Sequence, residues 1–182
     1  ADEIPLHGFG AARGMAVESR EGWISGGFGR LSEGQTADAF EWLARGEALI
    51  YGLNTGLGNL RDERVPSEII GAMQPVIVRG HAGALGPALP TAIVRAAMAV
   101  RVAGIARGGS GASPAIGETY VAMLNAGVHP IVPTVGSVGA GDLMHMAAIA
   151  VVAMGEGRAE VGGEELSGVE ALARTGIAPL VL

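Results

Sequence analysis

Two side chains that can carry a proton, a phenol and an imidazole, lie in glycine-rich stretches of this chain. Tyr51 opens a stretch that reads YGLNTGLG and ends at Gly58, and His81 opens one that reads HAGALG and ends at Gly86. Histidine is the side chain best suited to proton transfer near neutral pH. A tyrosine on a flexible loop can present its phenol to a ligand, or it can pack its ring and bond its hydroxyl to the backbone. Both interpretations stay open for Tyr51, and a purely structural role stays open for His81.

A third glycine-rich stretch runs from Gly136 to His145 and reads GSVGAGDLMH. Its glycines allow bends that a side chain would forbid, and Asp142 is placed as an N-cap before an apolar run that reaches Met154. The pattern predicts a loop that feeds a helix over residues 142–154, with backbone N–H groups pointing at whatever is bound. The alternative is a tight turn into a buried helix that binds nothing.

Helices must position these loops, and local signals predict where they lie. Residues 1–35 are rich in glycine and poorly periodic, so we expect an irregular segment there. A capping box at Ser32 and Gln35 predicts a helix over residues 36–45. Further helices are expected to begin near Pro66, to span 91–106, to run from a cap at Ser113 to about residue 125, and to span 167–174.

Extended segments are predicted between the later helices. Residues 128–134 should be extended because Pro130 and Pro133 each push the preceding residue out of the helical region. A hairpin is expected over residues 158–165, with its turn at Gly162 and Gly163. Residues 177–182 are apolar and are interpreted as a strand or a linker that leads toward more protein.

Composition excludes several classes of function. The chain has 182 residues, a formal net charge of −6 and no basic stripe, which argues against nucleic-acid binding. It has no cysteine, and its longest apolar run, residues 146–154, is about half of the roughly 20 residues that a membrane span needs. No secretory signal opens the sequence, so we expect a soluble, cytoplasmic protein. No metal site is expected, because the histidines lack the spacing of helical ligand pairs: His7, His81, His129 and His145.

Four motifs, in this order and spacing, resemble those of the histidine and phenylalanine ammonia-lyase family of aromatic amino-acid lyases. The stretch from Tyr51 is similar to the family's YGVNTGFG, and the stretch from His81 is similar to its SHAAGVG turn. Residues 124–140, which read LNAGVHPIVPTVGSVGA, are similar to the approach to the family's catalytic loop, and the GEGRA of residues 155–159 is similar to the signature after it. The likeness covers residues 36–182.

The resemblance implies a mainly α fold, the N-terminal part of an ammonia-lyase (L-aspartase-like) helical fold with short strands and glycine-rich active-site loops. Residues 36–182 would then form an N-terminal helical domain that is incomplete without a following helical bundle. In this family active sites are assembled from several subunits of a homotetramer. The chain therefore looks like a fragment, a nicked product or one subunit of a split protein, and we expect it to be inactive alone.

The resemblance also implies a reaction, the elimination of ammonia from an aromatic or heteroaromatic amino acid such as histidine. Tyr51 would be the general base that removes the β proton, and His81 would shape the pocket for the substrate side chain. A phenol has a reference pKa near 10, so such a base needs a positive neighbour or a helix dipole. The other implied substrate-binding residues belong to the Tyr51 stretch: Asn54, Leu57 and Gly58.

The sequence departs from the family at the catalytic loop. There an Ala-Ser-Gly triplet cyclises into a methylidene-imidazolone, an electrophile that makes ammonia a better leaving group, whereas this chain reads Ala140, Gly141 and Asp142, and is also shorter after Leu143. We assign these three residues to the catalytic loop facing the amine. Either the chain is a divergent member without the prosthetic group, or a modified residue between Ala140 and Gly141 is not visible in the sequence.

Three hypotheses about function follow from this departure. The first is an ammonia-lyase with the prosthetic group, and the second is a lyase of the same fold that works without one. The third is a non-catalytic regulatory or structural homologue, which the other departures would also fit. Ala103 and Ser113 stand where the family tends to carry Asn and Arg, and Leu57 replaces the usual Phe.

Overall fold

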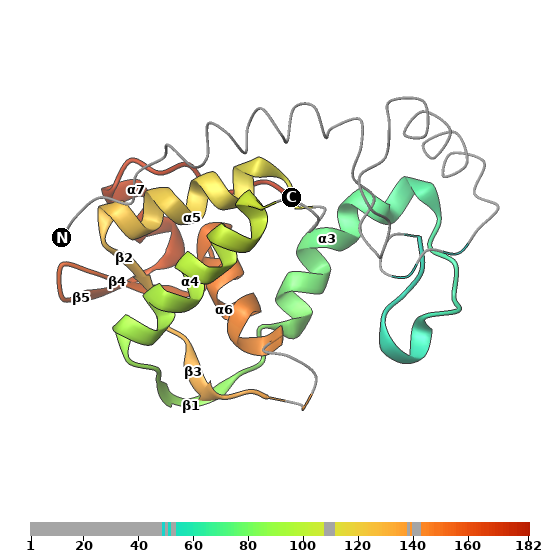
Figure 1. Ribbon diagram of the computed structural model, residues 1–182, viewed down its shortest axis with the longest axis horizontal. Helices are drawn as coiled ribbons and strands as arrows, with labels where there is room; N and C mark the ends of the chain where they lie inside the picture. The colour runs from blue at the N-terminus through green and yellow to red at the C-terminus, as the bar shows by residue number, and fades with distance from the viewer. Residues whose placement is uncertain (1–48, 50, 52–53, 108–111, 138, 140–142) are drawn as a thin grey trace.

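The computed structural model describes residues 49, 51, 54–107, 112–137, 139 and 143–182 (Figure 1). The predicted irregular segment 1–35 and the predicted helix over 36–45 lie outside this part of the chain. The described elements follow in chain order: η1 (Gly58–Leu60), α3 (Ser67–His81), β1 (Leu85–Ala88), α4 (Thr91–Ala106), α5 (Pro114–Ala126), β2 (Val128–Pro130), β3 (Pro133–Val135), α6 (Leu143–Ala153), β4 (Arg158–Val161), β5 (Glu164–Ser167) and α7 (Gly168–Arg174). The fold is mainly α with short strands, as predicted.

Local signals set the ends of the helices. Ser113 caps α5 by accepting a hydrogen bond from the N–H of Ala115 at 3.3 Å, Pro114 occupies the first turn, and Gly127 ends the helix in the left-handed conformation with φ 70°. The prediction for α4 is confirmed at both ends. A capping box opens α7, in which Ser167 and Glu170 satisfy each other's backbone N–H groups.

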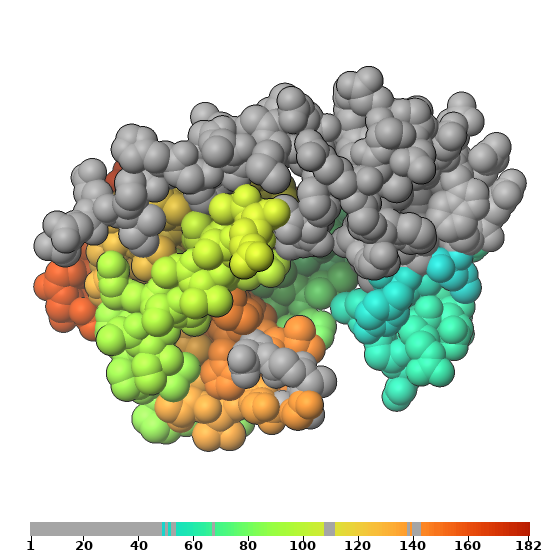
Figure 2. Space-filling model, viewed as in Figure 1, coloured from blue at the N-terminus to red at the C-terminus, as the bar shows by residue number. Residues whose placement is uncertain are grey.

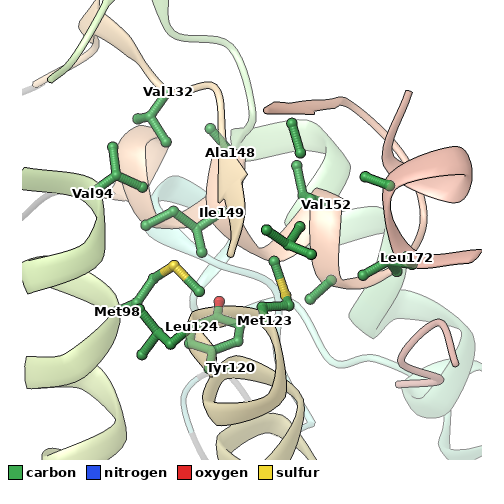
Figure 3. Close-up of a cluster of buried hydrophobic side chains, with 14 of the residues drawn as sticks. Val94, Met98, Tyr120, Met123, Leu124, Val132, Ala148, Ile149, Val152 and Leu172 are labelled. Atoms are coloured by element: carbon green, nitrogen blue, oxygen red, sulfur yellow. The ribbon is translucent and has the colours of Figure 1, made fainter. Parts of the chain in front are cut away.

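The hydrophobic core lies between α4, α5 and α6, and α7 closes one side of it (Figure 3). Because the chain has few aromatic residues, aliphatic side chains and two methionines fill this space. The labelled core residues are Val94, Met98, Tyr120, Met123, Leu124, Val132, Ala148, Ile149, Val152 and Leu172. Burial raises the pKa of the Tyr120 phenol to about 12, with Arg101 opposing the shift.

Two small antiparallel sheets flank the helices. In one sheet β4 pairs with β2 and with β5, and the two glycines of the β4–β5 turn, Gly162 and Gly163, have φ of 62° and 84°. Positive φ at both turn residues suits the right-handed twist of a hairpin, so the predicted hairpin is confirmed, although its second strand extends to Ser167. Residues 177–182 carry neither helix nor strand, and the N–H of Leu180 donates to the carbonyl of Ala153 at 2.8 Å.

The second sheet contains β1 and β3, in which Leu85 pairs with Val135 and Ala88 with Pro133. The predicted extended segment over residues 128–134 thus supplies strands to two different sheets. The sequence did not predict β1, because its LGPA contains a glycine and a proline, both poor strand formers, and all four residues are exposed. Its extended shape depends on the distant partner strand.

Candidate active site

The loop that begins at Tyr51 is held closed by its own backbone. The N–H of Val65 donates to the carbonyl of Asn54 at 2.8 Å, and the N–H of Gly56 donates to the carbonyl of Glu63 at 3.0 Å. Asn54 is buried with its neighbour Thr55, Leu57 is half-buried and Gly58 is exposed with φ 59°. The loop is therefore a defined structure that presents its outer residues from one end of α3 (Figure 1).

The phenol of Tyr51 lies on the surface of this loop. Its hydroxyl accepts a hydrogen bond from the N–H of Gly58 at 3.2 Å, while the residue is 62% exposed. The hydroxyl thus bonds to the backbone, which was one of the two interpretations of the sequence, but the ring is not packed. An exposed ring held by one backbone hydrogen bond leaves the hydroxyl accessible to a ligand.

His81 is the last residue of α3. Its Nδ1 lies 2.7 Å from the carbonyl oxygen of Ile77, one turn earlier in the helix. Because a carbonyl oxygen can only accept, Nδ1 must carry the proton, and Nε2 of the neutral ring is then the nitrogen free to accept a proton or a hydrogen bond. The side chain is half-buried. This hydrogen bond fixes both the orientation and the tautomer of the imidazole.

The pairing of β1 with β3 brings the His81 turn beside the glycine-rich bend. Leu85 at the start of β1 pairs with Val135 at the end of β3. Because the His81 turn immediately precedes Leu85 and the bend immediately follows Val135, the pairing places the two segments side by side. A Cβ built on Gly136 would lie 3.0 Å from the Cβ atoms of both Ala84 and Met144. The His81 turn, the start of the bend and the first turn of α6 are therefore packed together, and a side chain at residue 136 would require these neighbours to shift by a few tenths of an ångström.

A second histidine holds the far side of the bend. Nε2 of His145, in the first turn of α6, lies 3.1 Å from the carbonyl oxygen of Thr134 in β3 and donates to it. This contact ties together the two elements between which the bend runs. From the sequence, His145 was considered only as a metal ligand, and its spacing argued against that role. No local pattern predicted its hydrogen bond to β3.

The Tyr51 loop and the His81 turn lie at opposite ends of α3. The helix has 15 residues, which at 1.5 Å per residue spans roughly 22 Å. Figure 2 shows a hollow in the surface between the cyan and teal residues of the Tyr51 loop and the orange residues of β3 and α6. The structure brings together two of the three glycine-rich stretches, and the third faces them across this hollow. Ala140, Gly141 and Asp142 lie outside the described residues.

An ion pair lies two residues before His81. Nη2 and Nε of Arg79 lie 2.6 Å and 2.9 Å from Oε1 of Glu156, in the turn between α6 and β4, and Nε lies 3.0 Å from Oε2. The hydrogen bond from Arg79 lowers the pKa of Glu156, and the same bond raises the pKa of Arg79. The pair was not predicted from the sequence, although the position of Glu156 between two glycines in GEGRA is a local signal for a special turn.

The residues that the structure describes contain neither a metal-binding cluster nor a membrane-spanning helix. Among them, no group of three or more His, Asp or Glu side chains could hold a metal ion. Within the same part of the chain, no helix combines the length and the apolar character needed to cross a membrane.

Comparisons with known proteins point to one family. The chain matches the family model for aromatic amino acid lyases over residues 33–182. Histidine ammonia-lyase of Gloeobacter violaceus is 44% identical over 143 residues, which are 78% of this chain and 28% of that protein. Probable histidine ammonia-lyase of Halobacterium salinarum is 42% identical over 138 residues, 75% of this chain and 26% of that protein. The chain thus spans little more than a quarter of these relatives.

Solved structures show the same fold. Phenylalanine aminomutase of Pantoea agglomerans superposes with a TM-score of 0.73 at 28% identity, covering 100% of this chain and 34% of that protein. Tyrosine aminomutase from Streptomyces globisporus superposes with a TM-score of 0.71 at 33% identity, covering 80% of this chain and 27% of that protein. Together with the family match over most of its length, these likenesses show that the chain belongs to the aromatic amino acid lyase family.

Proposed function

We propose that the protein to which this chain contributes eliminates ammonia from an aromatic or heteroaromatic amino acid. The observation that carries the proposal is the packing of the His81 turn against the glycine-rich bend through β1 and β3. Histidine is the favoured substrate, because relatives named histidine ammonia-lyase are 40–44% identical to the chain.

In this proposal each site residue has one role. The Tyr51 phenolate removes a proton from the β carbon, the electrons of that C–H bond form the α,β double bond, and the C–N electron pair leaves with the nitrogen of the substrate's ammonium group, which departs as neutral ammonia. His81 contacts the substrate side chain through Nε2, the nitrogen that its bond to Ile77 leaves free. The bend at Ala140, Gly141 and Asp142 faces the amine. Asn54, Leu57 and Gly58 shape the Tyr51 side of the pocket.

The prosthetic group of the family does not fit the residues that the sequence provides. A methylidene-imidazolone needs a serine hydroxyl to lose as water, and the triplet here is Ala140, Gly141 and Asp142. No step of the proposed reaction passes through that group. This absence favours the second candidate function, a lyase of the same fold that relies on its base and loop alone. A non-catalytic homologue is the remaining alternative.

We further propose that the working protein is a cytoplasmic homo-oligomer, a tetramer by resemblance, in which a helical bundle completes the site. The domain organisation proposed for residues 1–35 and 36–182 belongs to the same view. Exposed aliphatic side chains on three elements support an assembly that covers them, because water-exposed apolar surface of this kind marks interaction sites: Leu85, Val100 and Val135.

The test is ammonia release by the intact protein from histidine, phenylalanine and tyrosine, followed by a coupled ammonia assay and by the ultraviolet absorbance of the unsaturated acid. We expect release from histidine to be fastest. Tyr51→Phe should abolish turnover and leave the fold intact, whereas Tyr120→Phe, which alters the other of the chain's two tyrosines, should keep it. Equal turnover by Tyr51→Phe and wild type would remove the assigned base.

Two further measurements separate the candidate functions. The mass of the peptide that contains residues 139–143 distinguishes the first two, because cyclisation removes water and an unmodified peptide keeps the mass of its sequence. Calorimetric titration with the three amino acids addresses the third, because a non-catalytic homologue without a substrate site would bind none of them.

A further inference from the structure

We propose that Arg79 and Glu156 are positioning residues, whose ion pair holds the C-terminal end of α3, and therefore His81, in place against the turn between α6 and β4. The inference rests on the proposed function, in which His81 contacts the substrate side chain. It adds two residues that make no contact with the substrate themselves.

The helix that carries His81 has little anchorage of its own. None of the side chains that the structure describes in α3 is buried, and its main neighbour is α6. Pro75 lies inside the helix, so the backbone hydrogen bond that would donate from residue 75 is absent and the ladder is weakened there. The segment after Pro75, which ends at His81, therefore needs an external contact to keep a fixed position.

The acidic partner lies on a turn that is closely packed against α7. The N–H of Glu156 donates to the carbonyl of Val151 at 2.8 Å, and the flanking residues Gly155 and Gly157 have φ of 84° and 63°. A Cβ built on Gly168 would lie 1.9 Å from the carbonyl oxygen of Glu156, so the turn packs directly on the backbone of α7. The carboxylate of Glu156 therefore projects from a backbone that is held in a fixed position.

The pair transmits that position to the histidine. Both Nε and Nη2 of Arg79 bond the carboxylate, a side-on arrangement that fixes the guanidinium in orientation as well as in distance. The carbonyl of Arg79 accepts from the N–H of Ala82 at 3.2 Å, and the carbonyl of His81 accepts from the N–H of Gly83 at 2.8 Å. A displacement of Arg79 therefore moves the turn that contains His81.

The exposure of the pair separates its geometric role from a stabilising one. The side chains of Arg79 and Glu156 are 52% and 40% exposed, and exposed ion pairs typically contribute about 0–1 kcal/mol to folding. The chain also contains a matched control pair. Arg174 in α7 and Glu164 in β5 lie 2.6 Å apart, with side chains 47% and 61% exposed, and neither α7 nor β5 belongs to the candidate site.

The experiment compares the two pairs in the intact protein. The variants are Arg79→Met, Glu156→Gln and their double variant, with Arg174→Met and Glu164→Gln as controls. Two measurements are made on each: amide hydrogen exchange by mass spectrometry over residues 76–86, and steady-state kinetics of ammonia release from histidine. The first measurement needs no activity, so it remains informative even where the proposed function fails.

If the proposal is right, Arg79→Met and Glu156→Gln each increase exchange over residues 76–86. Each also raises KM about tenfold with a smaller effect on kcat, because a misplaced binding group costs substrate affinity. The double variant is no worse than either single variant, since both remove one interaction. Arg79→Lys keeps the charge without the side-on geometry, so it should increase the exchange and KM less than Arg79→Met does. The controls match wild type in both measurements.

Several results would overturn the inference. Exchange over residues 76–86 that is unchanged in Glu156→Gln shows that the pair does not hold the end of α3. Increased exchange without a change in KM shows that the pair holds the helix but not the substrate site. Equal effects in Glu164→Gln show a general loss of rigidity. Failure of the wild type to release ammonia from any of the three amino acids refutes the proposed function, whereas the exchange comparison still decides whether the pair holds α3.

Discussion

Replacing Gly168 by alanine should destabilise the protein strongly, although the change adds one methyl group. A Cβ at this position would lie 1.9 Å, 2.7 Å and 2.9 Å from the carbonyl oxygen, the carbonyl carbon and the nitrogen of Glu156, whereas ordinary contact begins at 3.4 Å. The two backbones would have to separate by about 1.5 Å, and neither is a flexible side chain that could turn aside. The clash must therefore be relieved by moving the turn or the start of α7.

The size of the effect follows from what that movement breaks. The N–H of Gly168 donates to the carbonyl of Gly157 at 3.0 Å, and the N–H of Glu156 donates to the carbonyl of Val151 at 2.8 Å. Weakening two such bonds costs about 0.5–1.5 kcal/mol each, and overpacking adds about 1–3 kcal/mol. We expect a loss of about 3 kcal/mol, which lowers the melting temperature of a chain of this size by roughly 6–12 °C.

The assay is thermal unfolding of the intact protein followed by circular dichroism, at one fixed protein concentration. Gly104→Ala in α4 is the matched control, because the same substitution there meets no atom within 4 Å and should stabilise the helix by up to about 1 kcal/mol. A Gly168→Ala variant that melts within about 2 °C of wild type would refute the claim that the turn and α7 are in close backbone contact.

Four further predictions concern other parts of the molecule. Burial, together with the charge of Arg95, lowers the pKa of His129 below its ordinary value of 6.5, so the unfolded chain binds the proton more readily and stability falls as the pH drops below about 6.5. In His129→Gln the melting temperature should fall less between pH 7.5 and pH 5.5, and an unchanged fall would contradict this. Gly136→Val should force the bend away from α6, lowering both stability and ammonia release; normal turnover would show that the packing there is not needed. Ser167→Ala removes the cap of α7 and should cost about 1 kcal/mol in chemical denaturation, a prediction that fails if the unfolding midpoint is unchanged. Met98→Ala, at a fully buried position, should cost about 2–5 kcal/mol by the same measurement, and a loss below about 1 kcal/mol would mean that the core there is not tightly packed.

The sequence predicted the elements whose signals are local. Ser113 and Gly127 mark the two ends of α5 by side-chain capping and by a left-handed backbone, both of which depend on a few neighbouring residues. The paired glycines at residues 162 and 163 marked the hairpin for the same reason. The second strand of the hairpin ends at Ser167, beyond the predicted residue 165, where the strand passes directly into a capped helix.

Elements that depend on distant partners were missed. Nothing in the LGPA of β1 favours a strand, and the segment is extended because β3, some fifty residues later, pairs with it. The ion pair between Arg79 and Glu156 joins residues 77 positions apart, and each of them alone resembles an ordinary surface charge. Pairing and charge contacts across such separations leave no periodic trace in a single sequence.

For the candidate site, the sequence by itself determined the chemical groups, their glycine-rich surroundings and, through four spaced motifs, the family. It also reads Ala140, Gly141 and Asp142 where the family has its Ala-Ser-Gly triplet. Only the tertiary structure decided that the His81 turn packs against the bend at Gly136 and that Arg79 pairs with Glu156. The physical reason is that residue types and local backbone preferences are encoded within a few neighbours, whereas the distance between two loops is set by strand pairing and helix packing between segments far apart in the chain.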